Sequence, residues 1–73
     1  MVKYIDLDRT FVALADPVRR AVLARLRQGD APVSALATDH PISLPAFLKH
    51  LRLLEHAGLV STEKVGRVRT CRL

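Results

Sequence analysis

The sequence predicts a mainly α-helical fold of four helices followed by a β-hairpin. Two observations carry this prediction. Proline and glycine divide the chain into short segments with helical apolar spacing as far as residue 57, and residues 59–73 change to a composition rich in Val, Thr and Ser. A chain of 73 residues is expected to form one domain, residues 1–73. So small a hydrophobic core gives only marginal stability by itself. Dimerisation or another partner is therefore expected.

The N-terminal half is expected to form two helices. The first covers residues 5–15, with Ile5, Leu7, Phe11, Leu14 and Ala15 as its apolar set. Asp16 and Pro17 then supply an N-cap and a proline at the first helical position, which together are a strong start signal for a second helix. That helix should end near Gln28, where Gly29 provides the left-handed stop.

A short helix, a turn and a longer helix should follow. Residues 30–32 are a connector, and residues 33–39 form the short helix, which ends because Pro41 excludes helical geometry from the residue before it. Ser43 caps the longer helix, which tolerates a proline in its first turn and ends at Gly58. This arrangement is a helix-turn-helix.

The C-terminal segment should be a β-hairpin. Residues 59–64 and 67–73 flank Val65-Gly66, with Gly66 at the position that needs a positive φ. Valine disfavours a type I′ turn, so a type II turn or a bulged form is expected, and the register stays open. With its basic residues, this hairpin makes the predicted fold a winged helix-turn-helix, with four helices before a β-hairpin wing.

The formal charge of +5 is concentrated in the C-terminal part of the chain. Residues 1–42 hold six basic and five acidic side chains, a net charge of +1, whereas residues 43–73 hold six and two, a net charge of +4. Candidate partners are nucleic acid, an acidic membrane surface or an acidic protein. A membrane role is disfavoured because no run approaches the ~18 apolar residues of a spanning helix and no basic helix carries bulky interfacial aromatics.

The predicted helix over residues 44–57 has two faces. The arc that can pack on the core is Ala46, Phe47, His50, Leu51, Leu53, Leu54 and Ala57. The opposite arc is Leu44, Pro45, Leu48, Lys49, Arg52, Glu55 and His56. Leu44 and Leu48 therefore lie outside the core stripe, either as incidental exposed leucines or as groups that meet thymine methyls in a major groove. Lys49 and Arg52 on the same face would reach phosphates or guanine.

Four cations, Lys64, Arg67, Arg69 and Arg72, lie in the predicted hairpin. Such a wing can lie along the DNA backbone or enter the adjacent minor groove, although a basic strand edge can also simply discourage aggregation. The residues expected to contact DNA are Ser43, Leu44, Pro45, Leu48, Lys49, Arg52, Lys64, Arg67 and Arg69.

The remaining polar residues predict structural roles rather than catalysis. Arg19 falls on the apolar arc of the second helix, so it should have a fixed partner, and a structural salt bridge is favoured over a DNA contact. His50 should be a hydrogen-bonded core histidine, and Cys71 a partly buried hairpin residue. No nucleophile–base pair, carboxylate dyad, phosphate-binding glycine loop or metal-ligand cluster is present in the sequence, which argues against an enzyme and against a bound cofactor or metal.

Three segments, ALADPVRR (residues 13–20), SLPAFLKHL (residues 43–51) and LEHAGLV (residues 54–60), resemble the arsenical-resistance-repressor (ArsR) family of bacterial winged-helix regulators. The resemblance implies a cytoplasmic, nucleoid-associated homodimer that binds an imperfect palindromic operator in double-stranded DNA and represses a nearby gene until an inducer weakens binding. It also implies that Ser43–Arg52 form the recognition helix and Lys64–Arg69 the wing.

The sequence departs from the family pattern at three places. Ser34-Ala35-Leu36-Ala37 stands where metal-sensing members carry a cysteine pair, which excludes thiolate sensing there. Leu44 and Leu48 replace polar residues of many members, and both differences favour a metal-independent subgroup. The family usually continues into a C-terminal dimerising helix, whereas this sequence ends at Leu73. Either the sequence is a truncated form, or dimerisation is expected to rely on the first helix and to be weakened.

Two functional classes follow from these patterns. The favoured one is a sequence-specific DNA-binding transcriptional regulator, most often a repressor in this family. The alternative is a winged-helix module for protein–protein interaction without DNA binding, in which Leu44 and Leu48 dock on a partner and the basic face steers an acidic one.

Overall fold

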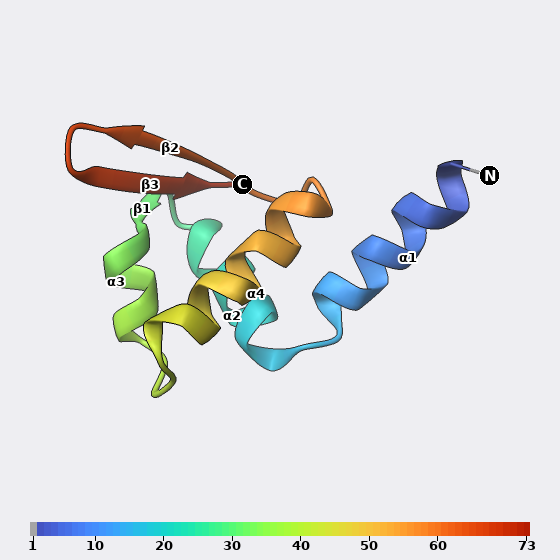
Figure 1. The fold of residues 1–73 in the computed structure, drawn as a ribbon, viewed down its shortest axis with the longest axis horizontal. Helices are drawn as coiled ribbons and strands as arrows, with labels where there is room; N and C mark the ends of the chain where they lie inside the picture. The colour runs from blue at the N-terminus through green and yellow to red at the C-terminus, as the bar shows by residue number, and fades with distance from the viewer. Residues whose placement is uncertain (1) are drawn as a thin grey trace.

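The computed structural model describes residues 2–73 and, in that range, has four helices and a small sheet (Figure 1). The elements are α1 (Val2–Leu14), α2 (Pro17–Leu26), β1 (Ala31–Pro32), α3 (Val33–Thr38), α4 (Leu44–His56), β2 (Ser61–Val65) and β3 (Val68–Arg72). In Figure 1, α4 crosses the middle of the molecule, the β2–β3 hairpin extends beyond it on one side, and α1 leads away on the other. This is the predicted order of helices and hairpin.

The predicted helix starts are confirmed. The Asp16 carboxylate accepts hydrogen bonds from the backbone N–H groups of Val18 (2.8 Å) and Arg19 (3.2 Å) at the start of α2. The Ser43 hydroxyl accepts one from the N–H of Ala46 (3.3 Å) at the start of α4. Each bond satisfies a donor that has no partner within its helix, which is why these residue types favour helix starts.

The apolar set predicted for the first helix lies largely outside the core. Ala13 is fully buried, whereas Leu7, Phe11 and Leu14 are 53%, 65% and 37% exposed. Ala15 is also exposed and follows the helix, and the side chain of Ile5 lies outside the described residues. The C-terminal end of α1 approaches α2 and α4, where a small alanine allows close contact, and the larger apolar residues face away from the core.

A third strand replaces the predicted connector. Ala31 pairs with Cys71 and Pro32 with Thr70 in antiparallel register, which gives a sheet of order β1-β3-β2. Two residues are too few to show an alternating pattern, and proline argues against a strand except at an edge, which is where β1 lies. The strand joins the base of the hairpin to the start of α3.

The hairpin turn falls one residue later than predicted. Val65 pairs with Val68, so the loop is Gly66-Arg67 rather than Val65-Gly66. Gly66 has φ +63°, and no non-glycine residue of residues 2–73 has a positive φ, so Arg67 follows with a negative value. These signs are those of a type II′ turn, whose twist matches the flanking strands and which requires glycine at its first central position.

All four helices, the strands β1 and β3 and the segment before β2 contribute to one hydrophobic core. Its members are Ala13, Val22, Leu26, Ala31, Val33, Leu36, Phe47, Leu51, Leu54, Val60 and Cys71. Cys71 is fully buried, rather than partly buried as predicted. Burial, with smaller effects from the charges of Glu55 and Asp30, raises the pKa of its thiol to about 11. A buried, protonated thiol is unsuited to redox sensing. No helix within residues 2–73 is long and apolar enough to cross a membrane.

The Asp16 cap predicts a measurable loss of stability on truncation. Asp16→Ala should lower the free energy of unfolding by about 1 kcal/mol in urea denaturation, whereas Asp16→Asn, which retains a capping oxygen, should lose much less. Equal stability of the wild-type and Asp16→Ala chains would contradict the capping role.

The same cap predicts a direction of pH dependence. Burial raises the pKa of Asp16, but the backbone N–H groups of Arg19 and Val18 and the nearby His50 and Arg19 lower it more, so it lies below its ordinary value. The stabilisation is therefore complete above the ordinary carboxyl pKa of about 3.9 and is lost as the pH falls through the lower folded-state value. Asp16→Ala should lack this acid-dependent component.

Candidate nucleic-acid interface

The N-terminal part of α4 presents an exposed surface. Ser43 and Pro45 are exposed and Leu44 is 54% exposed, as predicted. Lys49 and Arg52 are also exposed, and neither has a hydrogen bond or ion pair among the described residues. The first three turns of α4 therefore offer two cations and an apolar side chain to a partner.

Leu48 differs from the sequence prediction. It is partly buried and packs against the core cluster rather than lying outside it. The apolar arc predicted for this helix is therefore too narrow, because the core extends round α4 as far as Leu48. Leu48 therefore contributes to the stability of the core and is also partly accessible at the surface of α4.

A concave space connects the helix-turn-helix to the wing. It has a volume of about 420 Å³ and is bounded by residues from α3, α4 and the hairpin: Pro32, Val33, Ser34, Leu44, Leu48, Arg67, Val68 and Arg69. Leu44 and Leu48 form one wall, and Arg67 and Arg69 stand opposite on the wing. Sequence reasoning missed the contributions of Val33 and Ser34, because only the pairing of β1 with β3 brings the start of α3 beside the wing.

Two cations face each other across the wing. Lys64 and Arg69 are direct partners in the β2–β3 register, and both are exposed. Like charges directly opposite on a sheet destabilise it unless an anion lies between them. Arg67 occupies the turn, and neither it nor Lys64 has a polar partner among the described residues. The wing therefore concentrates positive charge near its tip.

Arg69 is held by a short relay that reaches α4. Its Nη1 donates to the Thr62 hydroxyl (3.1 Å), and that hydroxyl donates to the Glu55 carboxylate (3.0 Å). Arg72, by contrast, is neutralised by Glu63 (3.2 Å) and Asp30 (3.6 Å) at the base of the hairpin. Of the four wing cations, Arg69 and Arg72 therefore have polar partners, whereas Lys64 and Arg67 have none among the described residues. The sequence did not predict the role of Thr62, because its partners are distant along the chain.

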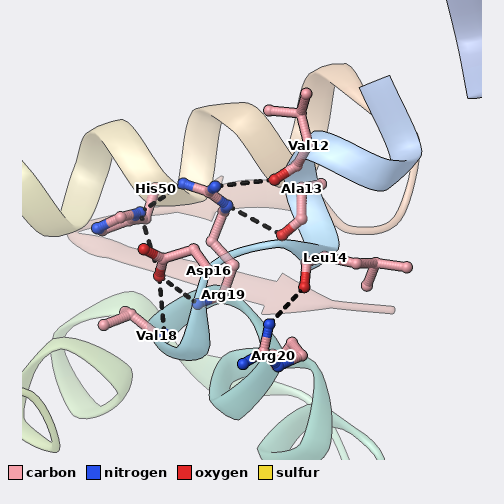
Figure 2. A network of polar contacts seen from close by, with 8 residues as sticks. All are labelled: Val12, Ala13, Leu14, Asp16, Val18, Arg19, Arg20 and His50. Atoms are coloured by element: carbon pink, nitrogen blue, oxygen red, sulfur yellow. Dashed lines mark hydrogen bonds and ion pairs between the residues drawn. The ribbon is translucent and has the colours of Figure 1, made fainter. Parts of the chain in front are cut away.

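A polar network joins α1, α2 and α4 (Figure 2). Arg19 is 8% exposed, and its Nε and Nη2 donate to the carbonyl oxygens of Ala13 (2.9 Å) and Val12 (2.8 Å). Its Nη1 lies 2.8 Å from His50 Nδ1. The predicted fixed partner of Arg19 is confirmed, but it consists of carbonyls and a histidine rather than a carboxylate, because the end of α1 has free carbonyl oxygens.

His50 is hydrogen-bonded, as predicted, and is partly rather than fully buried. Its Nδ1 also lies 3.8 Å from Asp16 Oδ1. A guanidinium has donors only, so Nδ1 must be the acceptor in the bond from Arg19 and the ring proton sits on Nε2.

A helix-turn-helix with a basic hairpin beside its second helix defines a winged-helix DNA-binding protein. Residues 14–63 match a family model described as "Helix-turn-helix domain". The chain is 42% identical over 73 residues to the HTH-type transcriptional regulator Rv2034 of Mycobacterium tuberculosis and covers 68% of it. It is 33% identical over 61 residues to the transcriptional repressor SdpR of Bacillus subtilis, with 84% of this chain and 68% of the repressor covered.

Solved structures agree with these relatives. The crystal structure of the ArsR family transcriptional regulator RHA00566 matches with a TM-score of 0.89 and 53% identity, over 93% of this chain and 70% of that one. A homodimeric winged helix-turn-helix domain of Mb0332 from Mycobacterium bovis matches with a TM-score of 0.89 and 29% identity, over 99% and 67%. The chain belongs to the ArsR family of winged-helix, DNA-binding transcriptional regulators.

The different burial of the two leucines predicts different consequences of truncation. Leu44→Ala should change the free energy of unfolding by less than about 0.5 kcal/mol. Leu48→Ala should cost about 1–2 kcal/mol, because it removes partly buried methyl groups from the edge of the core. Denaturant unfolding of both variants checks this, and equal losses would contradict the assigned packing of Leu48.

Proposed function

We propose that this chain represses transcription as a homodimer, with the start of α4 in the DNA major groove and the wing on the backbone or in the adjacent minor groove. The observation that carries the proposal is the shared concave space, because Leu44 and Leu48 of α4 and Arg67 and Arg69 of the wing bound it together. One DNA duplex can therefore contact both elements at once. A recognition helix with base contacts at its N-terminal end fits this geometry.

The side chains at the start of α4 suit apolar rather than hydrogen-bonding base contacts. The exposed Leu44 and Pro45 can meet thymine methyls, and Leu48 can do so at the edge of its packing. The Ser43 hydroxyl already accepts the capping bond but can still donate to a phosphate. Because few base-reading donors remain, DNA shape should contribute to specificity.

The unpaired cations supply the phosphate contacts. Lys49 and Arg52 from α4, and Lys64 and Arg67 from the wing, have no polar partner in the described part of the chain. Arg69 is already oriented by Thr62, and it can share a phosphate with Lys64, which would relieve the repulsion between these cross-strand cations.

The regulator belongs to the metal-independent subgroup in this proposal. The residues at positions 34–37 of α3 are serine, alanine, leucine and alanine, which provide no thiolate for a soft metal ion. The relatives are named as regulators and repressors, and the described surface is assigned to DNA contact rather than to an enzymatic reaction.

The outer face of α1 provides the dimer contact. Leu7, Phe11 and Leu14 recur at i, i+4 and i+7 and are all exposed, so they form one apolar stripe on this helix. Exposed stripes of this kind mark protein interfaces. The homodimeric state of the Mb0332 domain supports this assignment.

The DNA proposal is tested by salt titration on duplexes selected from a random pool with the wild-type chain. The logarithm of the affinity should fall linearly with the logarithm of salt concentration, and Arg67→Ala and Lys64→Ala should each reduce the slope by about 0.9. Arg27→Ala, which removes an exposed cation from the end of α2, should leave the slope unchanged.

Two results would contradict that proposal. The first is an absence of duplex binding even at low salt, which would favour the alternative of a winged-helix module for protein–protein interaction. The second is an equal loss of slope in Arg27→Ala and Arg67→Ala, which would show that only the net charge matters.

The dimer proposal is tested by sedimentation over a range of concentrations. Phe11→Glu should shift the wild-type dimer to a monomer, because it places a charge in the centre of the apolar stripe. Val65→Glu, at a 69% exposed apolar residue of the wing, is the matched control and should remain dimeric. A dimeric Phe11→Glu chain would place the interface elsewhere.

A further inference from the structure

We propose that Arg19 and His50 are positioning residues for DNA binding: together they clamp the end of α1 to the middle of α4 and so fix the direction of α1 relative to the recognition helix. The clamp is visible in Figure 2, where the guanidinium lies between the carbonyl oxygens of Val12 and Ala13 and the ring of His50. This inference rests on the proposed function, in which α1 carries the dimer contact and α4 the DNA contact.

Packing alone does little to orient α1. Among its described side chains, from Leu7 onward, Ala13 is the one that is buried. A methyl group restrains direction poorly, whereas a planar guanidinium with three directed hydrogen bonds restrains it well. Arg19 uses Nε and Nη2 for the last turn of α1 and Nη1 for α4, so a change at either end alters the relation between the two helices.

The clamp requires a neutral His50. Arg19 can only donate, so protonation of Nδ1 removes the acceptor and places two cations together. The Asp16 carboxylate, 3.8 Å from the same nitrogen, is then the favoured partner of the ring. His50 would therefore exchange Arg19 for Asp16, and the link that Arg19 makes between the end of α1 and α4 would be broken.

The charged groups in contact with the His50 ring are Asp16 and Arg19, both at the start of α2. From α1, the groups of the network are carbonyl oxygens held by Arg19. On α4 itself, the residues one turn away are Ala46, Phe47, Leu53 and Leu54. The exchange between Arg19 and Asp16 is thus the local consequence of protonating this ring.

Loss of the clamp should weaken DNA binding because it alters the spacing between the two recognition helices of a dimer. A dimer reads two half-sites separated by a fixed number of base pairs, so the two recognition helices must be held at one distance and angle. If α1 can turn relative to α4, fewer dimers have the correct spacing. Protonation should therefore decrease affinity, which is opposite to the increase that an added positive charge alone would give.

The experiment measures the affinity of the wild-type chain for its selected duplex between about pH 8 and pH 5.5 at constant ionic strength. The wild type should bind about 10-fold more weakly at the acidic end. In His50→Asn, the amide oxygen can replace Nδ1 as the acceptor without titrating, so binding at pH 8 should be retained and the acid loss should disappear.

Further variants separate the clamp from general effects. His50→Leu should bind about 10-fold more weakly even at pH 8, because it has no acceptor for Arg19. Arg19→Lys should behave similarly, since one ammonium group cannot replace the planar set of donors. His56→Asn, which removes a histidine from the exposed end of α4, should keep the wild-type pH profile.

The outcomes are distinguishable. If the wild type binds DNA but His50→Asn shows the same acid loss, or His50→Leu binds as the wild type does at pH 8, the clamp is overturned while the proposed function stands. If the wild type binds no duplex at pH 8, the proposed function itself fails and this inference fails with it.

Discussion

The packing of α4 is the constraint on which the rest of the structure depends. Phe47, Leu51 and Leu54 recur at i, i+4 and i+7 on one side of this helix and are almost completely buried. Among the described residues, the other helices and the strands β1 and β3 each add one or two buried apolar residues around it. The opposite face of α4 is left free for charged and apolar groups that contact a partner.

The same small core explains how the basic residues are divided. Near the base of the wing, β3 pairs with both β1 and β2, and acidic residues are close enough to neutralise Arg72. Toward the tip, the strands leave the body and no acidic group is paired with Lys64 or Arg67. Net charge is therefore a poor guide to binding here, because distance from the core decides which cations remain available.

The sequence predicted what depends on neighbours along the chain. The Asp16 and Ser43 caps, the helix order and the hairpin are local signals, and the structure confirms them. It did not predict β1 or the partial burial of Leu48, because both depend on strands that return from the far end of the chain. The sequence also left open what covers the stripe of α1, because periodicity shows that a helix has an apolar face, but not which surface covers it.

The exposed stripe of α1 and the Arg19 network have one physical origin. A helix whose large apolar residues face away from its own domain receives little orientation from the core, and the carbonyl oxygens of its last turn remain without helical partners. The buried Arg19 compensates for both the weak orientation and the unpaired carbonyl oxygens. It donates to two of these oxygens and adds a directed contact to α4. An apolar residue at position 19 could fill the space but not supply these bonds. The orientation of α1 thus explains the buried charge of Arg19, because apolar packing restrains the direction of that helix only weakly.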